Sequence, residues 1–259
     1  MSENQEIPAC EVHDLKVSYD KKPVLWGIDF KIPKGVLVGI IGPNGSGKTT
    51  LLNSILGLKK ADRGYAKVFG EDISKMRKRV SYVPQRDTVD WDFPATVFEV
   101  VLMGRYGQLG LFKRPGKIDR QIALDSLEKV GMQDFKGRQI SELSGGQQQR
   151  VFIARSLAQQ ADCYFLDEPF AGVDASSEAS IIALMKKLVK DGKTLIVVHH
   201  DLNSVQNYFE WLILLNLRMI AAGPTKEVFT EENLSKTYGG QLTILSRIAE
   251  ATGRNSGIS

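Results

Sequence analysis

The sequence is poor in cysteine, histidine and long hydrophobic runs. Its 259 residues include two cysteines, Cys10 and Cys163, which lie far apart, and three histidines, of which two are adjacent. A structural zinc site or a disulfide framework needs more of these residues at close spacing. The longest apolar runs cover residues 36–41, 195–198 and 211–215, whereas a membrane-spanning helix needs about 20 apolar residues. If the protein works at a membrane, we expect a separate chain to cross it.

A strong excess of one charge sign is also missing. The chain has 34 basic and 30 acidic residues, a net charge of +4, and they are interspersed. Nucleic-acid-binding domains usually carry a clustered basic stripe. The scattered charges indicate a solvated surface, and we predict no nucleic-acid partner. A hydrophobic fraction of 42% is ordinary for a globular domain.

Short apolar runs rich in valine and isoleucine alternate with longer stretches of helical spacing. This alternation predicts an α/β fold with a largely parallel sheet. We expect buried strands at residues 36–41, 164–166, 195–198 and 211–215, with a helix at 49–56 after the first strand. Residues 96–141 predict an all-helical insertion that contains a helix at 119–130. The final residues, 246–259, predict a flexible tail.

A glycine-rich segment follows the first predicted buried strand. It matches the pattern G-x-x-x-x-G-K-[ST] at every fixed position: Gly42-Pro43-Asn44-Gly45-Ser46-Gly47-Lys48-Thr49. The glycines let backbone N–H groups point inward at anionic oxygens, and the next helix offers its amino-terminal end to the same anion. Lys48 is expected to reach the β- and γ-phosphates and Thr49 to ligate Mg²⁺. The alternative, a turn that only caps a helix, is weakened by the strand before it and the helix after it.

Two carboxylates end another predicted strand. Asp167 and Glu168 follow the apolar residues 163–166 and precede Pro169. Two carboxylates directly after a buried strand are costly unless they have partners or a chemical role, and ligands of α/β sheets lie at the carboxyl ends of the strands. We expect Asp167 to hold the Mg²⁺ that Thr49 contacts and Glu168 to act as general base on water. The alternative is an ordinary polar exit from the strand.

A second candidate anion site precedes a long predicted helix at residues 148–160. Ser144 is a suitable N-cap, and Gly145 and Gly146 let a phosphate approach the backbone closely. Because the P-loop already surrounds one side of a nucleotide, this second cradle favours contact with the nucleotide of another copy. We therefore predict a head-to-tail dimer.

At these residues the chain resembles the ABC ATPase family, whose LSGGQ motif it carries at Leu143-Ser144-Gly145-Gly146-Gln147. The resemblance covers residues 10–240. It implies that the glycine-rich loop, Thr50, the residues from Ser144 to Gln147, and Asp174 contact ATP. It also implies that Tyr19 stacks on adenine, although a lone tyrosine is also typical of a core.

The same resemblance assigns the remaining catalytic residues. It implies that Gln85 contacts Mg²⁺ and water, and that His200 contacts the γ-phosphate. His199 and His200 are adjacent, so on a strand they point to opposite faces, which argues against a joint metal site. We expect His199 to pack or to face solvent.

The resemblance also implies the fold and the cofactors. The fold is a P-loop NTPase core with a mainly parallel sheet, an N-terminal antiparallel β part and a helical signature subdomain at about residues 86–160. These parts form one domain at residues 10–245. The cofactors are ATP and Mg²⁺. A soluble ABC ATPase acting on nucleic acid is the competing class, but such proteins usually contain two ATPase units or a long coiled coil, and this sequence has one P-loop and no sustained heptads.

Residues 85–106, together with the pair of histidines, are similar to the bacterial importers of manganese, zinc or iron. The partners implied are a second copy of the chain, a multi-span membrane permease and, indirectly, a metal-binding receptor, with the chain on the cytoplasmic face of the membrane. Trp91, Phe93 and Pro94 are expected either to form a groove for the permease or to be core residues. An importer of iron chelates or of another small nutrient is the alternative.

Overall fold

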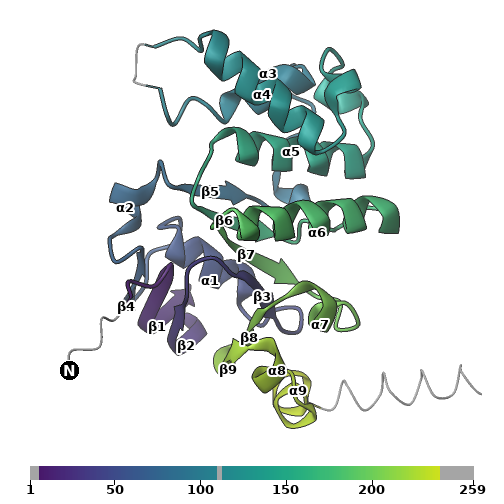
Figure 1. The fold of residues 1–259 in the computed structure, drawn as a ribbon. Coiled ribbons are helices and arrows are strands. Elements are labelled where there is room, and N and C mark those ends of the chain that lie inside the picture. The colour runs from purple at the N-terminus through teal and green to yellow at the C-terminus, as the bar shows by residue number, and fades with distance from the viewer. Residues whose placement is uncertain (1–5, 110–112, 240–259) are drawn as a thin grey trace, which may run out of the picture.

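The computed structural model describes residues 6–109 and 113–239 (Figure 1). The predicted tail at 246–259 and the predicted domain end at 245 lie outside the described residues. Within them, a six-stranded sheet, a three-stranded sheet and a group of helices pack around two hydrophobic clusters.

The central sheet has six strands among the described residues, in the order β5-β6-β7-β3-β8-β9. Neighbouring strands are parallel except β8 and β9. All residues of β3, β6 and β7 are buried, which explains their uninterrupted apolar sequences. The four predicted strands are confirmed within one residue at each end. The bounds are Leu37–Ile41 (β3), Val80–Val83 (β5), Cys163–Asp167 (β6), Thr194–His199 (β7), Trp211–Asn216 (β8) and Arg218–Pro224 (β9).

The N-terminal sheet is antiparallel, in the order β2-β1-β4, and confirms the predicted antiparallel β part. Side chains of β1 alternate between buried and less buried positions over most of the strand, because one face packs on the protein and the other faces outward. Val12, Leu15 and Val17 share a core with Leu51 and Leu52 of α1. This sheet therefore packs over the helix that follows the glycine-rich loop. The bounds are Cys10–Tyr19 (β1), Lys22–Ile32 (β2), Arg63–Val68 (β4) and Lys48–Ile55 (α1).

The predicted helical insertion is confirmed. Helices α3, α4 and α5 lie together beside the sheet (Figure 1) and contact one another. Their buried side chains join the larger hydrophobic cluster, which continues under the central sheet. The bounds are Arg86–Thr88 (η1), Val97–Met103 (α3), Lys117–Lys129 (α4), Gln133–Phe135 (η2), Ile140–Glu142 (η3) and Gly145–Ala158 (α5).

The predicted N-cap Ser144 is confirmed, but α5 begins directly after it at Gly145 and not at the predicted residue 148. Two glycines in succession disfavour a helix by propensity. Here the Ser144 side chain accepts from Gln147 N–H at 3.4 Å, and Gln147 Oε1 accepts from Ser144 N–H at 3.0 Å. This reciprocal cap satisfies the N–H groups of Ser144 and Gln147. It therefore allows the helix to begin at the two glycines despite their low propensity.

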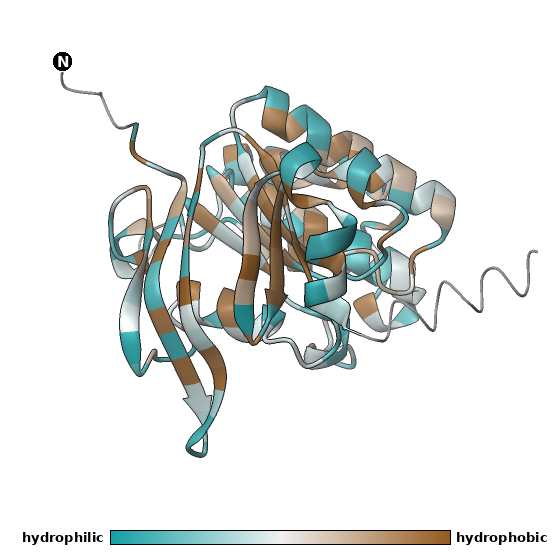
Figure 2. Cartoon of the chain, turned by 90° about the horizontal axis from the view of Figure 1, so that it is seen from below, coloured by the Kyte–Doolittle hydropathy of each residue, from teal (hydrophilic) through white to brown (hydrophobic). Residues whose placement is uncertain are grey.

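The remaining helices cover the sheet. Helix α6 packs against β3 and β7, and α9 packs against β8 and β9. The strands between these layers are the most hydrophobic part of the fold (Figure 2). In the described part of the chain, no helix combines the length and the apolar character needed to cross a bilayer. The bounds are Ile73–Met76 (α2), Ala175–Lys190 (α6), Val205–Tyr208 (α7), Thr225–Val228 (α8) and Glu231–Tyr238 (α9).

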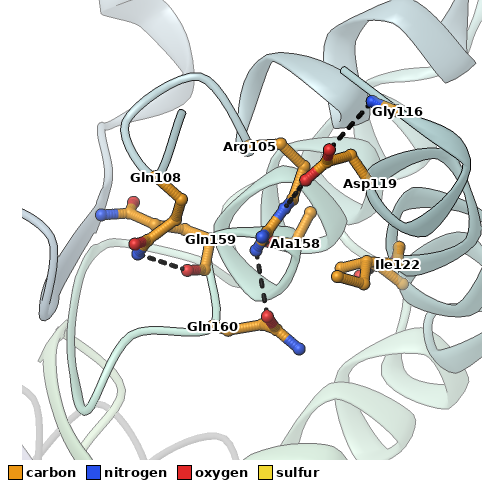
Figure 3. Close-up of polar contacts among 9 residues, drawn as sticks. Arg105, Gln108, Gly116, Asp119, Ile122, Ala158, Gln159 and Gln160 are labelled. Carbon is orange, nitrogen blue, oxygen red and sulfur yellow. Dashed lines mark hydrogen bonds and ion pairs between the residues drawn. The ribbon is translucent and has the colours of Figure 1, made fainter. Parts of the chain in front are cut away.

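A buried ion pair joins the ends of the three clustered helices (Figure 3). Arg105, just after α3, donates from Nε to Asp119 of α4 at 2.9 Å. Its Nη1 donates to the carbonyl of Ala158 at 2.8 Å and to Gln160 Oε1 at 3.0 Å, at the carboxyl end of α5. Hydrogen bonds from Gly116 N–H and from Arg105 lower the pKa of Asp119. The guanidinium thus binds the carboxyl end of α5 and fixes it to α4.

The packing of α4 generates a stability prediction. Leu127 is fully buried in the larger cluster, whereas Ile118 on the same helix is 77% exposed. Leu127→Ala should lower the free energy of unfolding by about 2–5 kcal/mol, because it removes buried methyl groups and leaves a cavity. Ile118→Ala should change it by less than about 0.5 kcal/mol. Urea unfolding followed by circular dichroism measures both, and equal losses would contradict the described orientation of α4.

Candidate active site

The carboxyl ends of β3, β5, β6 and β7 meet at one edge of the central sheet. Ile41 pairs with His199, and Asp167 pairs with Val198. Each of these strands runs directly into a predicted motif, so segments up to about 160 residues apart in sequence are brought side by side. In open α/β sheets, this edge is where ligands bind.

The glycine-rich loop joins β3 to α1 and wraps around the Lys48 side chain. Lys48 is buried, and its Nζ donates to the carbonyls of Gly42 at 2.9 Å and Pro43 at 3.0 Å. Burial lowers the pKa of Lys48, and the charges of Glu168 and Asp167 oppose this. Gly47 has φ 96°, and a Cβ there would lie 2.7 Å from Leu25. Only glycine fits this turn, which leads the chain into α1.

Asp167 is a fully buried carboxylate at the end of β6. Its Oδ1 accepts from Thr49 Oγ1 at 3.4 Å, and its Oδ2 has no hydrogen-bond partner among the described residues. Burial raises the pKa of Asp167, the Thr49 hydrogen bond and Lys48 lower it, and Glu168 raises it. A buried carboxylate oxygen without a partner is unfavourable. Together with the Thr49 hydroxyl it forms the hard oxygen donor set that suits Mg²⁺.

Glu168 follows Asp167 in a strained conformation. Its φ is 50°, in the left-handed region that non-glycine residues rarely adopt. Its Oε2 accepts from Gln85 Nε2 at 3.4 Å. Such strain persists only where surrounding structure imposes it, and it is common at functional sites. The turn aims Glu168 toward the glycine-rich loop, whose cavity it helps to line.

The glycine-rich loop lines a cavity of about 410 Å³, within the range of small-molecule sites. Tyr19, the last residue of β1, is 43% exposed, and Lys59 Nζ lies 4.0 Å from the centroid of its ring. The exposed ring can stack on a base, which supports the predicted role over the core alternative. The lining residues are Tyr19, Val24, Asn44, Gly45, Ser46, Gly47, Lys48, Thr49, Thr50 and Glu168.

The two histidines differ in environment. His200 is exposed directly after β7, whereas His199 is buried and packs edge-on against Phe170 at 5.5 Å. Burial lowers the pKa of His199 to about 4, and His200 adds to the effect. His199 is therefore neutral near pH 7, with Nε2 at 2.7 Å from Ser204 Oγ. As expected, His199 packs, and its ring holds the loop that follows His200.

The motif from Ser144 to Gln147 does not line the cavity, and neither does Asp174. Gly146 lies against the loop before Asp174, because a Cβ on it would be 3.4 Å from the Gly172 carbonyl. Asp174 caps α6, accepting from Ser177 N–H at 3.0 Å and Ser177 Oγ at 2.6 Å. The two predicted cradles are therefore separate within one chain.

Several contacts at the site were not predicted from the sequence. Val24 lines the cavity, Lys59 covers Tyr19, and Ser204 holds His199. Each is a common residue type outside any motif, so no sequence signal marks it. Trp91 and Phe93 pack against the helical core, as the core alternative expected: the Trp91 ring lies 4.7 Å from that of Phe152.

Comparison with known proteins agrees with this geometry. The family model described as "ABC transporter" matches residues 25–171. The chain is 57% identical over 235 residues to the manganese transport system ATP-binding protein MntB of Bacillus subtilis, covering 91% of this chain and 94% of that protein. It is also 57% identical over 235 residues to the zinc transport system ATP-binding protein TroB of Treponema pallidum, covering 91% and 88%.

A solved structure shares the fold. The dimeric post-hydrolysis state of the ATP-binding cassette MJ0796, bound to ADP and phosphate, superposes with a TM-score of 0.75 at 28% identity, covering 83% of this chain and 98% of that one. The family model covers more than half of the 259 residues, and the two relatives cover most of the chain. The chain belongs to the ABC transporter family, as one of its ATP-binding proteins.

Proposed function

We propose that the chain hydrolyses MgATP at the cavity beside the glycine-rich loop and powers import of manganese or zinc through a separate membrane permease. The observation that carries the proposal is the buried Asp167 Oδ2, which has no hydrogen-bond partner in the described part of the chain, while Oδ1 accepts from Thr49 and the next residue is the strained Glu168. A structural role alone gives no reason to keep these carboxylates together at a strand end.

Different residues of the site bind different parts of ATP. The backbone N–H groups of residues 44–49 and the amino-terminal end of α1 bind the phosphates, and Lys48 leaves its carbonyl partners to pair with the β- and γ-phosphates. Tyr19 stacks on adenine, which its exposed ring supports. Thr49, Asp167 and Gln85 would hold Mg²⁺, which neutralises charge on the β- and γ-phosphates when bound.

Glu168 is the general base in this proposal. Its carboxylate takes a proton from a water molecule as the water oxygen bonds to the γ-phosphorus, and the bond from that phosphorus to the bridging oxygen breaks. The products are ADP and inorganic phosphate. Gln85, hydrogen-bonded to Glu168, orients the same water. His200 contacts the γ-phosphate in this proposal, and the neighbouring His199 is hydrogen-bonded to Ser204.

We also propose that a second copy completes each site. Ser144, Gly145, Gly146 and Gln147 lie outside the cavity of their own chain, at a helix N-terminus suited to a phosphate. A head-to-tail pair brings this cradle, and Asp174 beside it, to the nucleotide of the partner. The dimeric ADP- and phosphate-bound structure of MJ0796 supports this arrangement.

The cargo proposal derives from the two relatives, whose names specify manganese and zinc transport. In the described residues, no group of three or more His, Cys, Asp or Glu side chains is placed to hold a metal. The permease and a metal-binding receptor therefore select the ion by ligand type and geometry, and this chain supplies energy from the cytoplasmic face. We assign to the permease a cavity of about 220 Å³ lined by Tyr82, Met103, Gly104 and Arg155, beside the strand β5 that leads to Gln85.

Glu168→Gln tests the chemistry. The variant keeps the shape and the Gln85 contact but loses the basic oxygen, so hydrolysis should fall by about 100-fold or more. ATP binding should remain, because Lys48 and the loop are intact. Phosphate release and binding of a fluorescent ATP analogue measure the two properties. Glu178→Gln, which changes a carboxylate outside the cavity, is the matched control, and near-parent turnover by Glu168→Gln would remove Glu168 as the base.

Deletion of the gene tests the cargo. Cells without it should lose high-affinity uptake of radiolabelled manganese or zinc, and the parent gene should restore it. Lys48→Ala should not restore uptake, because the main charge on the β- and γ-phosphates is gone. Intact uptake of manganese, zinc and iron, with loss of an iron chelate or another solute, would contradict the metal proposal and leave the ATPase proposal in place.

A further inference from the structure

Arg86 connects two parts of the site that serve different nucleotides in the proposed dimer. It follows Gln85 in the chain, and its Nη2 donates to Gln148 Oε1 at 3.0 Å, in the first turns of α5. Gln148 is itself buried and donates to the carbonyl of Ile140 at 3.2 Å. A Cβ on Gly145 would lie 3.0 Å from Arg86 Cζ. The guanidinium therefore packs directly on the backbone of Gly145, and a side chain at that position would have to displace it.

Trp91 holds Arg86 in this place. The indole Nε1 donates to the Arg86 carbonyl at 2.9 Å, and the ring centroid lies 5.8 Å from the guanidinium. The same ring packs on Phe152 of α5, with centroids 4.7 Å apart. Both the backbone and the side chain of Arg86 are thus fixed against α5.

The energy of the contact between the Arg86 guanidinium and the amino-terminal end of α5 depends on whether an anion is bound there. A cation beside a helix N-terminus is unfavourable, because the first N–H groups already carry positive partial charge. Arg86 Nε is buried and has no hydrogen-bond partner among the described residues. A phosphate at Ser144 and Gly145 attracts both the helix end and the guanidinium, and so removes the repulsion between them. The energy of the Arg86 position therefore depends on whether the partner's nucleotide is there.

The other end of the connection is the chain's own site. Gln85 donates to Glu168 at 3.4 Å and is joined to Arg86 by one peptide bond. We infer that Arg86 couples the two nucleotide sites of the dimer, by linking Gln85 and Glu168 at one ATP to the Ser144–Gly145 cradle at the other. This inference rests on the proposed dimer function. Because coupling of binding energies is reciprocal, each ATP favours the productive position of Gln85 at the other site.

Arg86→Ala tests the coupling in the purified full-length chain. The rate of ATP hydrolysis is measured against ATP concentration, and the Hill coefficient, whose limit for two sites is about 2, is compared with the parent. We expect a coefficient above 1 for the parent and close to 1 for Arg86→Ala. Binding of a fluorescent ATP analogue to the dilute chain should be unchanged, which a general structural defect would not allow.

Further variants isolate the contact. Arg86→Lys keeps the charge and folds readily but loses the planar fork that reaches Gln148, so it should also lower the Hill coefficient. Gln148→Met should do the same, and the double variant should be no worse than either single one. Asp87→Asn is the control: this 83% exposed carboxylate lies 3.9 Å from Arg86 Nη1, and its loss leaves the Gln148 contact intact.

The outcomes separate the two proposals. A parent-like Hill coefficient in Arg86→Ala or in Arg86→Lys, a hyperbolic parent, or an equal loss in Asp87→Asn would overturn the coupling while leaving the ATPase function standing. A parent chain that hydrolyses no ATP would contradict the proposed function, and the coupling with it.

Discussion

The register of the parallel strands is the constraint on which the site depends. Pairing of Ile41 with His199 and of Asp167 with Val198 places the carboxyl ends of β3, β6 and β7 side by side. A strand slipped by one residue would turn its side chains to the other face, and Asp167 would no longer meet Thr49. The apolar residues of these strands, buried on both faces, fix that register. The hydrophobic core therefore positions the carboxylates as directly as any polar contact does.

Local patterns in the sequence predicted four strands of the central sheet, the glycine-rich loop and the acidic pair, because each depends on neighbouring residues. The helix at Gly145 starts earlier than predicted, since the Ser144 and Gln147 cap outweighs the low helix propensity of glycine. The contacts of Arg86 with Gln148 and of His199 with Ser204 depend on how helices and loops pack, and nothing local encodes them. Trp91 fits the same rule: its inward packing on Phe152 follows from the position of α5. The roles assigned to the residues of the site remain predictions.

The placement of polar groups indicates how one chain can serve two nucleotides. The Lys48 cavity and the Ser144 cradle lie apart. Arg86 contacts Gly145 at the start of α5, and Gly146 of the same helix lies against the loop that contains Gly172. The buried pair of Arg105 with Asp119 fastens the far end of that helix. The contacts of Arg86 and Arg105 thus attach both ends of α5 to neighbouring elements.

The most direct test of the composite site is a cross-link between chains. Asn44→Cys and Ser144→Cys each add one exposed thiol, on a Glu168→Gln background that retains ATP, and the two variants are mixed. The native thiols do not interfere, because both are buried and burial raises the pKa of Cys10 to about 12. The account predicts a disulfide between the two variant chains that forms only with MgATP. No cross-link with MgATP, or one that forms equally well without nucleotide, would contradict it.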